Sequence, residues 1–302
     1  MQQKNYLRRI VDKYPYRLIS PAKINIYLNI LEKFPDGYHR IISLVEKITL
    51  CDYIYLRINF SGRVKIAYVG FSIPTDGDNS ICKAVRLFNQ YFGTNVGLEV
   101  FIEKNIPPAR GLGGHSSNSA TIVKFLNRYL KINAPLPLLK KIFSHLSKDI
   151  PVFLEEAPFC IVEGKGEEVT PLNIFNKFNH LIWISPKGLS TSQVYQVYNI
   201  GLTSKIEDVN IITTFLEERK LEWVGECCFN ALERSAVSLY PEIWKLKNLL
   251  VSKNIKIVGM SGSGPVIFCM DEDFKKVPYR WKGWYSIQAW TFLTGGDGHG
   301  SN

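Results

Sequence analysis

The sequence has no long hydrophobic run. No apolar stretch reaches the ~18 residues that a membrane-spanning helix needs, so we expect no membrane partner. Residues 1–18 are basic but lack the apolar core of a secretion signal. This segment is therefore predicted to be a short basic extension and not a targeting peptide.

Metal-binding patterns of cysteine and histidine are also missing. The six cysteines form no Cys-x-x-Cys pair, and none stands at metal-ligand spacing from a histidine. Cys51, Cys160 and Cys269 lie in or beside apolar strand-like runs, where a free cysteine behaves as a small core residue. The pattern is typical of the reducing cytoplasm, where we expect this protein.

The sequence has few acidic residues relative to basic ones, and no long run of either. Its formal net charge is +10, which favours anionic partners but does not choose among nucleic acid, membrane and phosphorylated metabolites. Because the lysines and arginines are scattered, the sequence shows no nucleic-acid-binding tail. We expect a phosphorylated small molecule and no nucleic acid.

Length and composition predict a globular protein of two domains. The chain has 302 residues, of which 46% are hydrophobic, and domains usually hold ~100–200 residues. Strand-like and helix-like patterns are mixed without a strict βαβ rhythm, which predicts an α+β fold. The expected division is an N-terminal nucleotide-binding domain at 1–165, a C-terminal α+β domain at 166–294 and a disordered tail at 295–302.

Hydrophobic periodicity predicts the individual elements. Strands are expected at 22–31, 54–60, 64–69, 98–103, 159–163, 181–185, 256–260, 265–270 and 285–292. Helices are expected at 79–92, 116–131, 135–148, 206–219, 226–236 and 241–252. Residues 34–38 contain Pro-Asp-Gly, which predicts a turn.

The strand expected at 22–31 has one apolar and one largely polar face. The apolar face consists of Ile24, Ile26, Leu28 and Ile30, and the opposite face of Lys23, Asn25, Tyr27 and Asn29. Such a polar row is either exposed to solvent or lines a site, and the pattern alone leaves both interpretations open.

A glycine-rich segment precedes the helix expected at 116–131. Gly111, Gly113 and Gly114 are followed by Ser116 and Ser117. A helix N-terminus leaves about four backbone N–H groups unpaired and carries partial positive charge, and glycines let the backbone wrap an anion closely. One glycine would suffice for an ordinary helix cap after a turn, so three glycines and two serines favour a phosphate-binding loop.

Other phosphate motifs are excluded. The sequence has no G-x-x-x-x-G-K-[ST], and it lacks the signature set of protein kinases. The dinucleotide pattern G-x-G-x-x-G fails because Ser116 occupies the place of its third glycine. A second glycine cluster, at 259–264, is either a flexible hairpin turn or a place where the backbone approaches a ligand.

Phosphoryl transfer needs charge stabilisation and often a carboxylate that takes the proton of the acceptor hydroxyl. Asp149, between a predicted helix and an apolar run, is the candidate base, and Lys23 is the candidate cation. Each taken alone is better explained as an ordinary residue, Asp149 in a turn and Lys23 on an exposed strand face.

These features together resemble the superfamily of galactokinases, homoserine kinases and mevalonate kinases, and they predict its two-domain α+β fold. Within it, the sequence is similar to the branch that phosphorylates a cytidine-diphosphate-linked methylerythritol in non-mevalonate isoprenoid synthesis. The similar segments span nearly the whole chain: 20–25, 35–39, 78–81, 106–120, 149–154, 164–167, 190–195 and 261–264.

The resemblance implies roles for individual residues. The catalytic pair would be Asp149, taking the proton of the C2 hydroxyl, and Lys23, holding Asp149 and that hydroxyl. The cofactors would be ATP and Mg²⁺, with Ser117 near the metal. ATP-binding residues would be Asn79, Pro107, Arg110, Gly111, Leu112, Gly113, Gly114, His115, Ser116 and Ser117. The residues for the cytidine-diphosphate-linked substrate would be Asn25, Tyr38, His39, Thr191, Tyr195, Gly262, Ser263 and Gly264.

The loop departs from the family pattern at His115, where a glycine is usual. A histidine there is strained if the position needs a positive φ, and otherwise its ring lies beside the phosphates. Two other functions stay open: a kinase for mevalonate, homoserine or a sugar, and a non-enzymatic basic binding protein. We expect a monomer or homodimer.

Overall fold

The structure is a computed structural model, and it describes residues 13–198 and 208–293. Within these ranges the chain forms two compact units. The first unit holds residues 13–22, 51–108 and 113–155, and the second holds 23–50, 109–112, 156–198 and 208–293. Strands β1 (Tyr16–Lys33) and β2 (His39–Asn59) contribute residues to both units.

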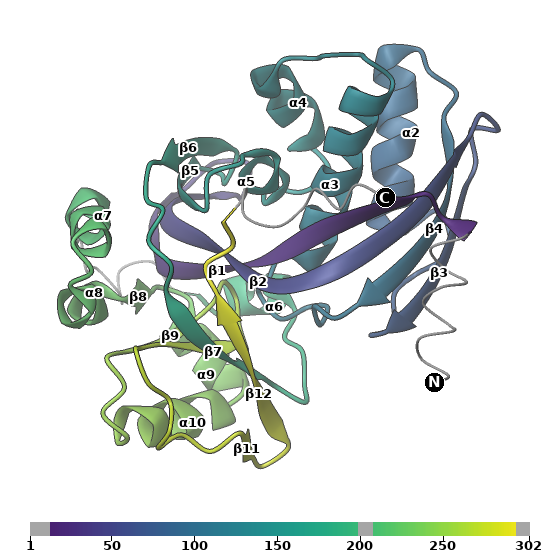
Figure 1. The fold of residues 1–302 in the computed structure, drawn as a ribbon. Helices are drawn as coiled ribbons and strands as arrows, with labels where there is room; N and C mark the ends of the chain where they lie inside the picture. The colour runs from purple at the N-terminus through teal and green to yellow at the C-terminus, as the bar shows by residue number, and fades with distance from the viewer. Residues whose placement is uncertain (1–12, 199–207, 294–302) are drawn as a thin grey trace, which may run out of the picture. The chain divides into compact units, whose positions relative to one another are not determined.

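The first unit combines strands with helices that cover them. Its strands are the end of β2, β3 (Val64–Gly70) and β4 (Gly97–Lys104), and its helices are α2 (Ser80–Phe92), α3 (Gly114–Tyr129), α4 (Leu136–Phe143) and α5 (Ile150–Leu154). Strand β4 pairs parallel with β3 and antiparallel with β2. Helices α2 and α3 lie side by side against these strands (Figure 1).

The core of the first unit forms where the apolar stripe of α2 meets the strands. Val85 and Phe88 from α2 belong to the same buried cluster as Leu98 and Val100 from β4. Burying each such side chain stabilises the fold by roughly 1.5–3 kcal/mol. The helix predicted at 79–92 from this stripe is confirmed.

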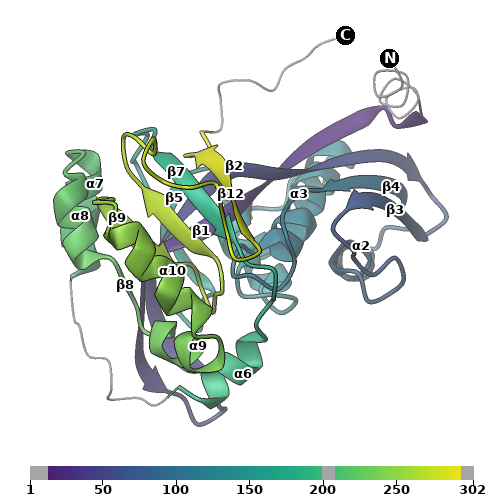
Figure 2. The ribbon, with the colours of Figure 1, turned by 90° about the horizontal axis from the view of Figure 1, so that it is seen from below.

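The second unit is built on a five-stranded antiparallel sheet, seen from below in Figure 2. The strand order is β11 (Arg280–Trp281), β12 (Trp284–Trp290), β7 (Asn179–Ile184), β10 (Ile267–Met270) and β9 (Ile257–Met260). Its helices are α6 (Thr191–Gln196), α7 (Val209–Glu217), α8 (Leu221–Cys227), α9 (Glu233–Leu239) and α10 (Glu242–Val251). Trp183 and Trp284 fill the core between this sheet and residues of α9 and α10.

Three further strands complete the second unit. Strand β5 (Phe159–Gly164) pairs antiparallel with the start of β2 and with β6 (Glu168–Leu172). Strand β8 (Phe229–Asn230) pairs parallel with β1.

The helix predicted at 226–236 is wrong. The chain there ends α8, forms the short strand β8 and then begins α9. Asn230 causes the break, because its side chain donates to the carbonyl oxygens of Met260 (2.7 Å) and Gly262 (2.8 Å). It also accepts a hydrogen bond from the Leu232 amide, which a continuous helix would not allow.

Other elements differ from the prediction in length. Strand β1 spans Tyr16–Lys33, where the pattern predicted 22–31. Strand β2 begins at His39 and not at residue 54. The sequence pattern missed its first part because the charged residues Glu46 and Asp52, which are fully buried, interrupt the apolar pattern. Helix α4 ends at Phe143, short of the expected residue 148, and a separate short helix, α5, carries Pro151 in its first turn, where its missing N–H costs nothing.

The expected domain boundary at residue 165 stays a prediction. The expected disordered tail at 295–302 lies outside the described residues, as do residues 206 and 207 of the helix predicted at 206–219, where the structure has α7. In the ranges that are described, no helix combines the length and hydropathy that crossing a bilayer requires.

Candidate active site

The glycine-rich segment leads directly into α3. Gly111 and Gly113 adopt left-handed backbone (φ 75° and 69°), and Gly113 is the N-cap residue. No side chain caps this N-terminus, and the first turn of α3 contains no acidic residue. Its partial positive charge is therefore available to an anion.

His115 is not strained. It lies in the first turn of α3, where the backbone is right-handed. Its carbonyl oxygen accepts hydrogen bonds from the Ser80 hydroxyl (3.0 Å) and the Ser119 hydroxyl (3.1 Å). The histidine thus fits the helix, and the bond from Ser80 ties the start of α2 to the start of α3.

Asp149 is tied to the same helix turn. The hydroxyls of Ser116 and Ser147 are 2.7 Å apart, and the Asp149 amide donates to Ser147 Oγ over 3.4 Å. Asp149 is half-buried and is the N-cap residue of α5. Within the first unit, two hydrogen bonds therefore connect the candidate base Asp149, through Ser147, to Ser116 in the first turn of α3.

The other two ATP-binding candidates of the first unit have structural partners or are buried. Asn79 caps α2, since its Oδ1 accepts from the Ile81 amide (2.9 Å) and its Nδ2 donates to the Pro74 carbonyl (2.6 Å). Pro107 is buried in the connection between β4 and α3.

A buried polar network that the sequence did not reveal underlies the loop. Lys104 pairs with Asp52, and both are almost fully buried. Burial lowers the pKa of Lys104, an effect that the charge of Asp52 opposes. Asn118 contacts both of them and also Ser20, which donates to Ser117 (2.7 Å). A charged residue beside apolar residues was the available signal at each position, but nothing in the sequence paired Asp52 with Lys104.

In the second unit, the polar face of β1 is buried and not exposed to solvent. Lys23 is 5% exposed and donates to Asn25 Oδ1 over 2.7 Å. Asn25 in turn donates to the Ser43 hydroxyl over 2.8 Å, and Ser43 donates to the Tyr27 carbonyl over 2.6 Å. The interpretation as an exposed strand face is therefore wrong for Lys23 and Asn25.

The glycine cluster at 259–264 joins β9 to β10 and contacts the start of the glycine-rich loop. Ser261 Oγ donates to the Gly111 carbonyl (2.9 Å) and accepts from the backbone N–H of Asn25 (3.2 Å). A Cβ on Gly111 would lie 2.2 Å from the Ser261 carbonyl oxygen. Leu112 also contacts β1, because its carbonyl accepts from the Lys23 amide over 3.0 Å. These contacts bring three predicted site segments together within one unit.

The rest of this turn combines two glycines in left-handed backbone with a hydroxyl that contacts α6. Gly262 and Gly264 have left-handed backbone (φ 56° and 77°), which glycine adopts without strain. The Ser263 hydroxyl lies 2.9 Å from that of Thr191, the first residue of α6. The candidates Thr191, Gly262, Ser263 and Gly264 therefore form one local cluster.

Aromatic residues gather around His39. Its ring centroid lies 5.1 Å from that of Tyr195 and 6.1 Å from that of Tyr198. Tyr38 is 53% exposed, and the Lys165 ammonium lies 5.4 Å from its ring centroid. Burial, followed by the charge of a neighbouring lysine, lowers the pKa of His39, which favours its neutral ring.

Arg110 contacts carbonyl groups. Its guanidinium donates to the carbonyl oxygens of Ser185 (3.0 Å) and Pro186 (3.3 Å). Burial lowers its pKa from the ordinary value. Arg110 thus fastens the segment before the loop to the end of β7.

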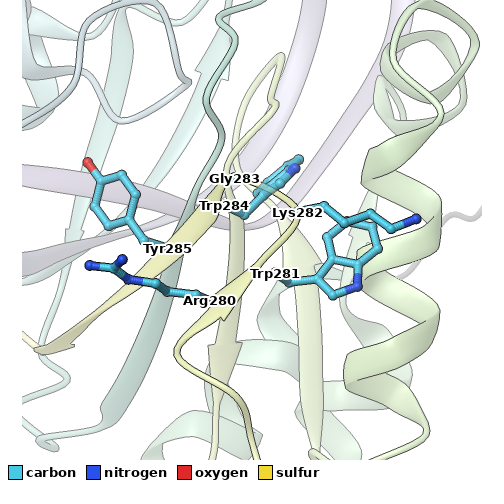
Figure 3. A pocket seen from close by; sticks show the side chains of 6 residues that line it. All are labelled: Arg280, Trp281, Lys282, Gly283, Trp284 and Tyr285. Carbon is cyan, nitrogen blue, oxygen red and sulfur yellow. The ribbon is translucent and has the colours of Figure 1, made fainter.

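A cavity of about 500 Å³ lies at the hairpin of β11 and β12. Its lining is Arg280, Trp281, Lys282, Gly283, Trp284 and Tyr285. In Figure 3, Arg280 and Tyr285 extend from one side of this hairpin and Trp281 and Lys282 from the other. The side chains diverge, so we assign no ligand to this cavity.

Family comparisons match both halves of the chain. Residues 79–154 match the family described as "GHMP kinases N terminal domain", and residues 212–282 match "GHMP kinases C terminal". Two similar relatives are the 4-diphosphocytidyl-2-C-methyl-D-erythritol kinases of Carboxydothermus hydrogenoformans and Thermodesulfovibrio yellowstonii. The first is 36% identical, with 86% of this chain and 89% of the relative covered; the second is 34% identical, with 82% and 86% covered.

Solved structures show the same fold. A crystal structure of 4-(cytidine 5'-diphospho)-2C-methyl-D-erythritol kinase gives a TM-score of 0.77 at 23% identity, covering 92% of this chain and all of that one. The mevalonate kinase of L. major, solved with R-mevalonate, gives 0.67 at 12% identity, covering 92% and 96%. The expected α+β fold of the galactokinase, homoserine kinase and mevalonate kinase type is confirmed.

Proposed function

The chain belongs to the 4-diphosphocytidyl-2-C-methyl-D-erythritol kinases, a family of GHMP kinases, and we propose that it transfers the γ-phosphoryl group of ATP to the C2 hydroxyl of that compound. This reaction belongs to non-mevalonate isoprenoid precursor synthesis. The observation that carries the proposal within the structure is the uncapped N-terminus of α3, tied through Ser116 and Ser147 to Asp149.

The loop would hold the ATP phosphates. Gly113, with left-handed backbone, directly precedes the N-terminus of α3, whose partial positive charge stabilises an anion. The Mg²⁺ that accompanies ATP would spread the phosphate charge. Ser117, the hydroxyl expected near that ion, is fully buried and already accepts a hydrogen bond from Ser20, so it does not fit a metal ligand in this arrangement.

Asp149 would activate the acceptor. As the C2 oxygen bonds to the γ-phosphorus and the bond to ADP breaks, the C2 hydroxyl proton would pass to the Asp149 carboxylate. Lys23 would stabilise the charge that develops on the acceptor oxygen. Its bond to Asn25 and its low exposure support this role, because an ammonium held in a buried polar row is oriented before the substrate arrives.

The aromatic cluster around His39 would bind the cytosine ring, with Tyr38 and Tyr195 supplying ring faces. A neutral His39 can both donate and accept a hydrogen bond, as the edge of a cytosine requires. Thr191, Ser263 and the glycines beside it would contact the remaining parts of the substrate.

The test is a substrate panel. The purified protein is incubated with Mg²⁺, ATP and one acceptor at a time: 4-diphosphocytidyl-2-C-methyl-D-erythritol, mevalonate, homoserine or galactose. We expect kcat/KM for the first to exceed the others by orders of magnitude. Faster turnover of another acceptor would replace the proposed substrate, and salt-dependent RNA binding without turnover of any acceptor would favour a non-enzymatic binding protein.

A cytoplasmic location and a monomeric or homodimeric state remain part of this proposal. Among the described residues the six cysteines form no disulfide with one another, which is consistent with a reducing compartment.

A further inference from the structure

In the buried network of Asp52, Lys104, Asn118, Ser20 and Ser117, the donor and the acceptor of every hydrogen bond can be assigned. Asp52 accepts four hydrogen bonds, from the amides of Asn105 and Ile106 (2.8 Å each), from Lys104 and from Asn118. Two of these bonds reach Oδ1 and two reach Oδ2, so both oxygens of Asp52 act as acceptors in this network.

Lys104 fixes the orientation of the Asn118 amide. An ammonium has only donors, so the atom of Asn118 that faces Lys104 (3.2 Å) is its oxygen. The Asn118 nitrogen must then donate its two hydrogens to Asp52 and to Ser20, each at 2.9 Å. Because the Ser20 oxygen accepts there, its own hydrogen goes to Ser117 Oγ, 2.7 Å away.

The network joins both ends of the loop. Asp52 holds the amides of Asn105 and Ile106, just before the loop, and the chain through Asn118 and Ser20 ends on Ser117, in the first turn of α3. The Lys104 ammonium lies 3.0 Å from the place where a Cβ on Gly114 would stand. The network therefore holds the residues on both sides of the loop in place.

We propose that Ser20, Asp52, Asn118 and Ser117 are positioning residues of the phosphate-binding loop, and that Ser117 is the end of this network and not a ligand of the metal. Ser117 is fully buried. The network would therefore affect nucleotide binding through the position of the loop and not through direct contact. This inference rests on the proposed binding of ATP at the loop.

The test is a double-mutant cycle on nucleotide affinity. The Kd of the non-hydrolysable ATP analogue AMP-PNP is measured by calorimetry for the wild type, Ser20→Ala, Ser117→Ala and the double variant, each with Mg²⁺ and with EDTA. We expect each single change to weaken binding about 3- to 10-fold, the equivalent of one neutral hydrogen bond. The double variant should be no weaker than Ser117→Ala alone, because Ser20 acts through Ser117.

A matched control is Ser119→Ala. Ser119 is equally buried on the same helix, but its hydroxyl donates only to the helix backbone at His115. Its replacement should leave the Kd within about twofold of the wild type, since one helical backbone contact contributes little. Melting temperatures measured alongside separate a loss of folding from a loss of positioning.

The Mg²⁺ comparison separates the two roles of Ser117. If Ser117 positions the loop, Ser117→Ala should weaken AMP-PNP binding equally with Mg²⁺ and with EDTA. A loss of affinity seen only with Mg²⁺ would make Ser117 a metal ligand and overturn the inference. Additive losses in the double variant, or unchanged affinity in both single variants, would overturn it as well. A wild type that binds no nucleotide would instead overturn the proposed function, and the inference with it.

Discussion

Gly111→Ala should be far more damaging than a glycine replacement usually is. Gly111 has φ 75°, and its Cβ would lie 2.2 Å from the Ser261 carbonyl oxygen and 3.4 Å from the Gly264 amide nitrogen. Left-handed backbone costs an alanine about 1–2 kcal/mol. The clash adds about 1–3 kcal/mol, because a backbone oxygen cannot rotate away as a flexible side chain can.

Gly93→Ala isolates the first of these two costs. Gly93 ends α2 with φ 64°, and its Cβ would meet nothing within 4 Å. Its replacement should therefore cost only the left-handed conformation, about 1–2 kcal/mol. Urea denaturation of both variants by linear extrapolation should place Gly111→Ala about 1–3 kcal/mol below Gly93→Ala.

Nucleotide and substrate binding give a second comparison of the same pair. Gly111 touches Ser261 in the late turn and begins the phosphate loop, so its replacement should also weaken both AMP-PNP and CDP, while Gly93→Ala leaves both affinities unchanged. Equal stability and equal affinities for the two variants would refute the close packing of the loop on Ser261.

Three further predictions concern single side chains. Asp149→Asn should lower kcat by orders of magnitude and leave AMP-PNP affinity within about threefold in calorimetry, because the amide cannot accept the proton; near-normal turnover would remove Asp149 from the mechanism. His180→Ala should lower the free energy of unfolding in urea by about 1–3 kcal/mol, since it removes the hydrogen-bond partner that lies 2.8 Å from the fully buried Glu46 side chain, and a loss under about 0.5 kcal/mol would contradict this. His39 should titrate below the ordinary value of about 6.5 in NMR, so the stability that its neutral ring contributes is present above that pH and is lost as the pH falls through its lowered pKa. A His39→Gln variant should lack this acid-induced loss, and an unchanged pH profile would show that His39 does not cause it.

The parts of the site that could be predicted are those encoded within short segments. Alternation along 22–31 put Lys23 and Asn25 on one face of a strand, and the structure joins them directly by a hydrogen bond. Glycines beside a helical pattern predicted the start of α3 within two residues. Such features depend on local backbone preferences, which can be inferred from neighbouring residues in the sequence.

The parts that could not be predicted depend on distant partners. Asp52 and Lys104 lie 52 residues apart in the chain, and only the pairing of β2 with β4 brings them together. The sequence pattern presents Asn118 as one polar residue of an amphipathic helix, although its side chain links Lys104 and Asp52 to Ser20. Asn230 breaks a predicted helix because it binds the turn after β9, which lies 30 residues further along the chain. Sequence periodicity carries no information on such contacts.

The most direct test of the central claim is the structure of the product. ³¹P NMR of a reaction with ATP, Mg²⁺ and 4-diphosphocytidyl-2-C-methyl-D-erythritol should show one new phosphomonoester at C2 for each ADP formed, and none when Asp149→Asn replaces the wild type over the same time. ADP without a phosphorylated product, or a phosphomonoester at another hydroxyl, would contradict the account.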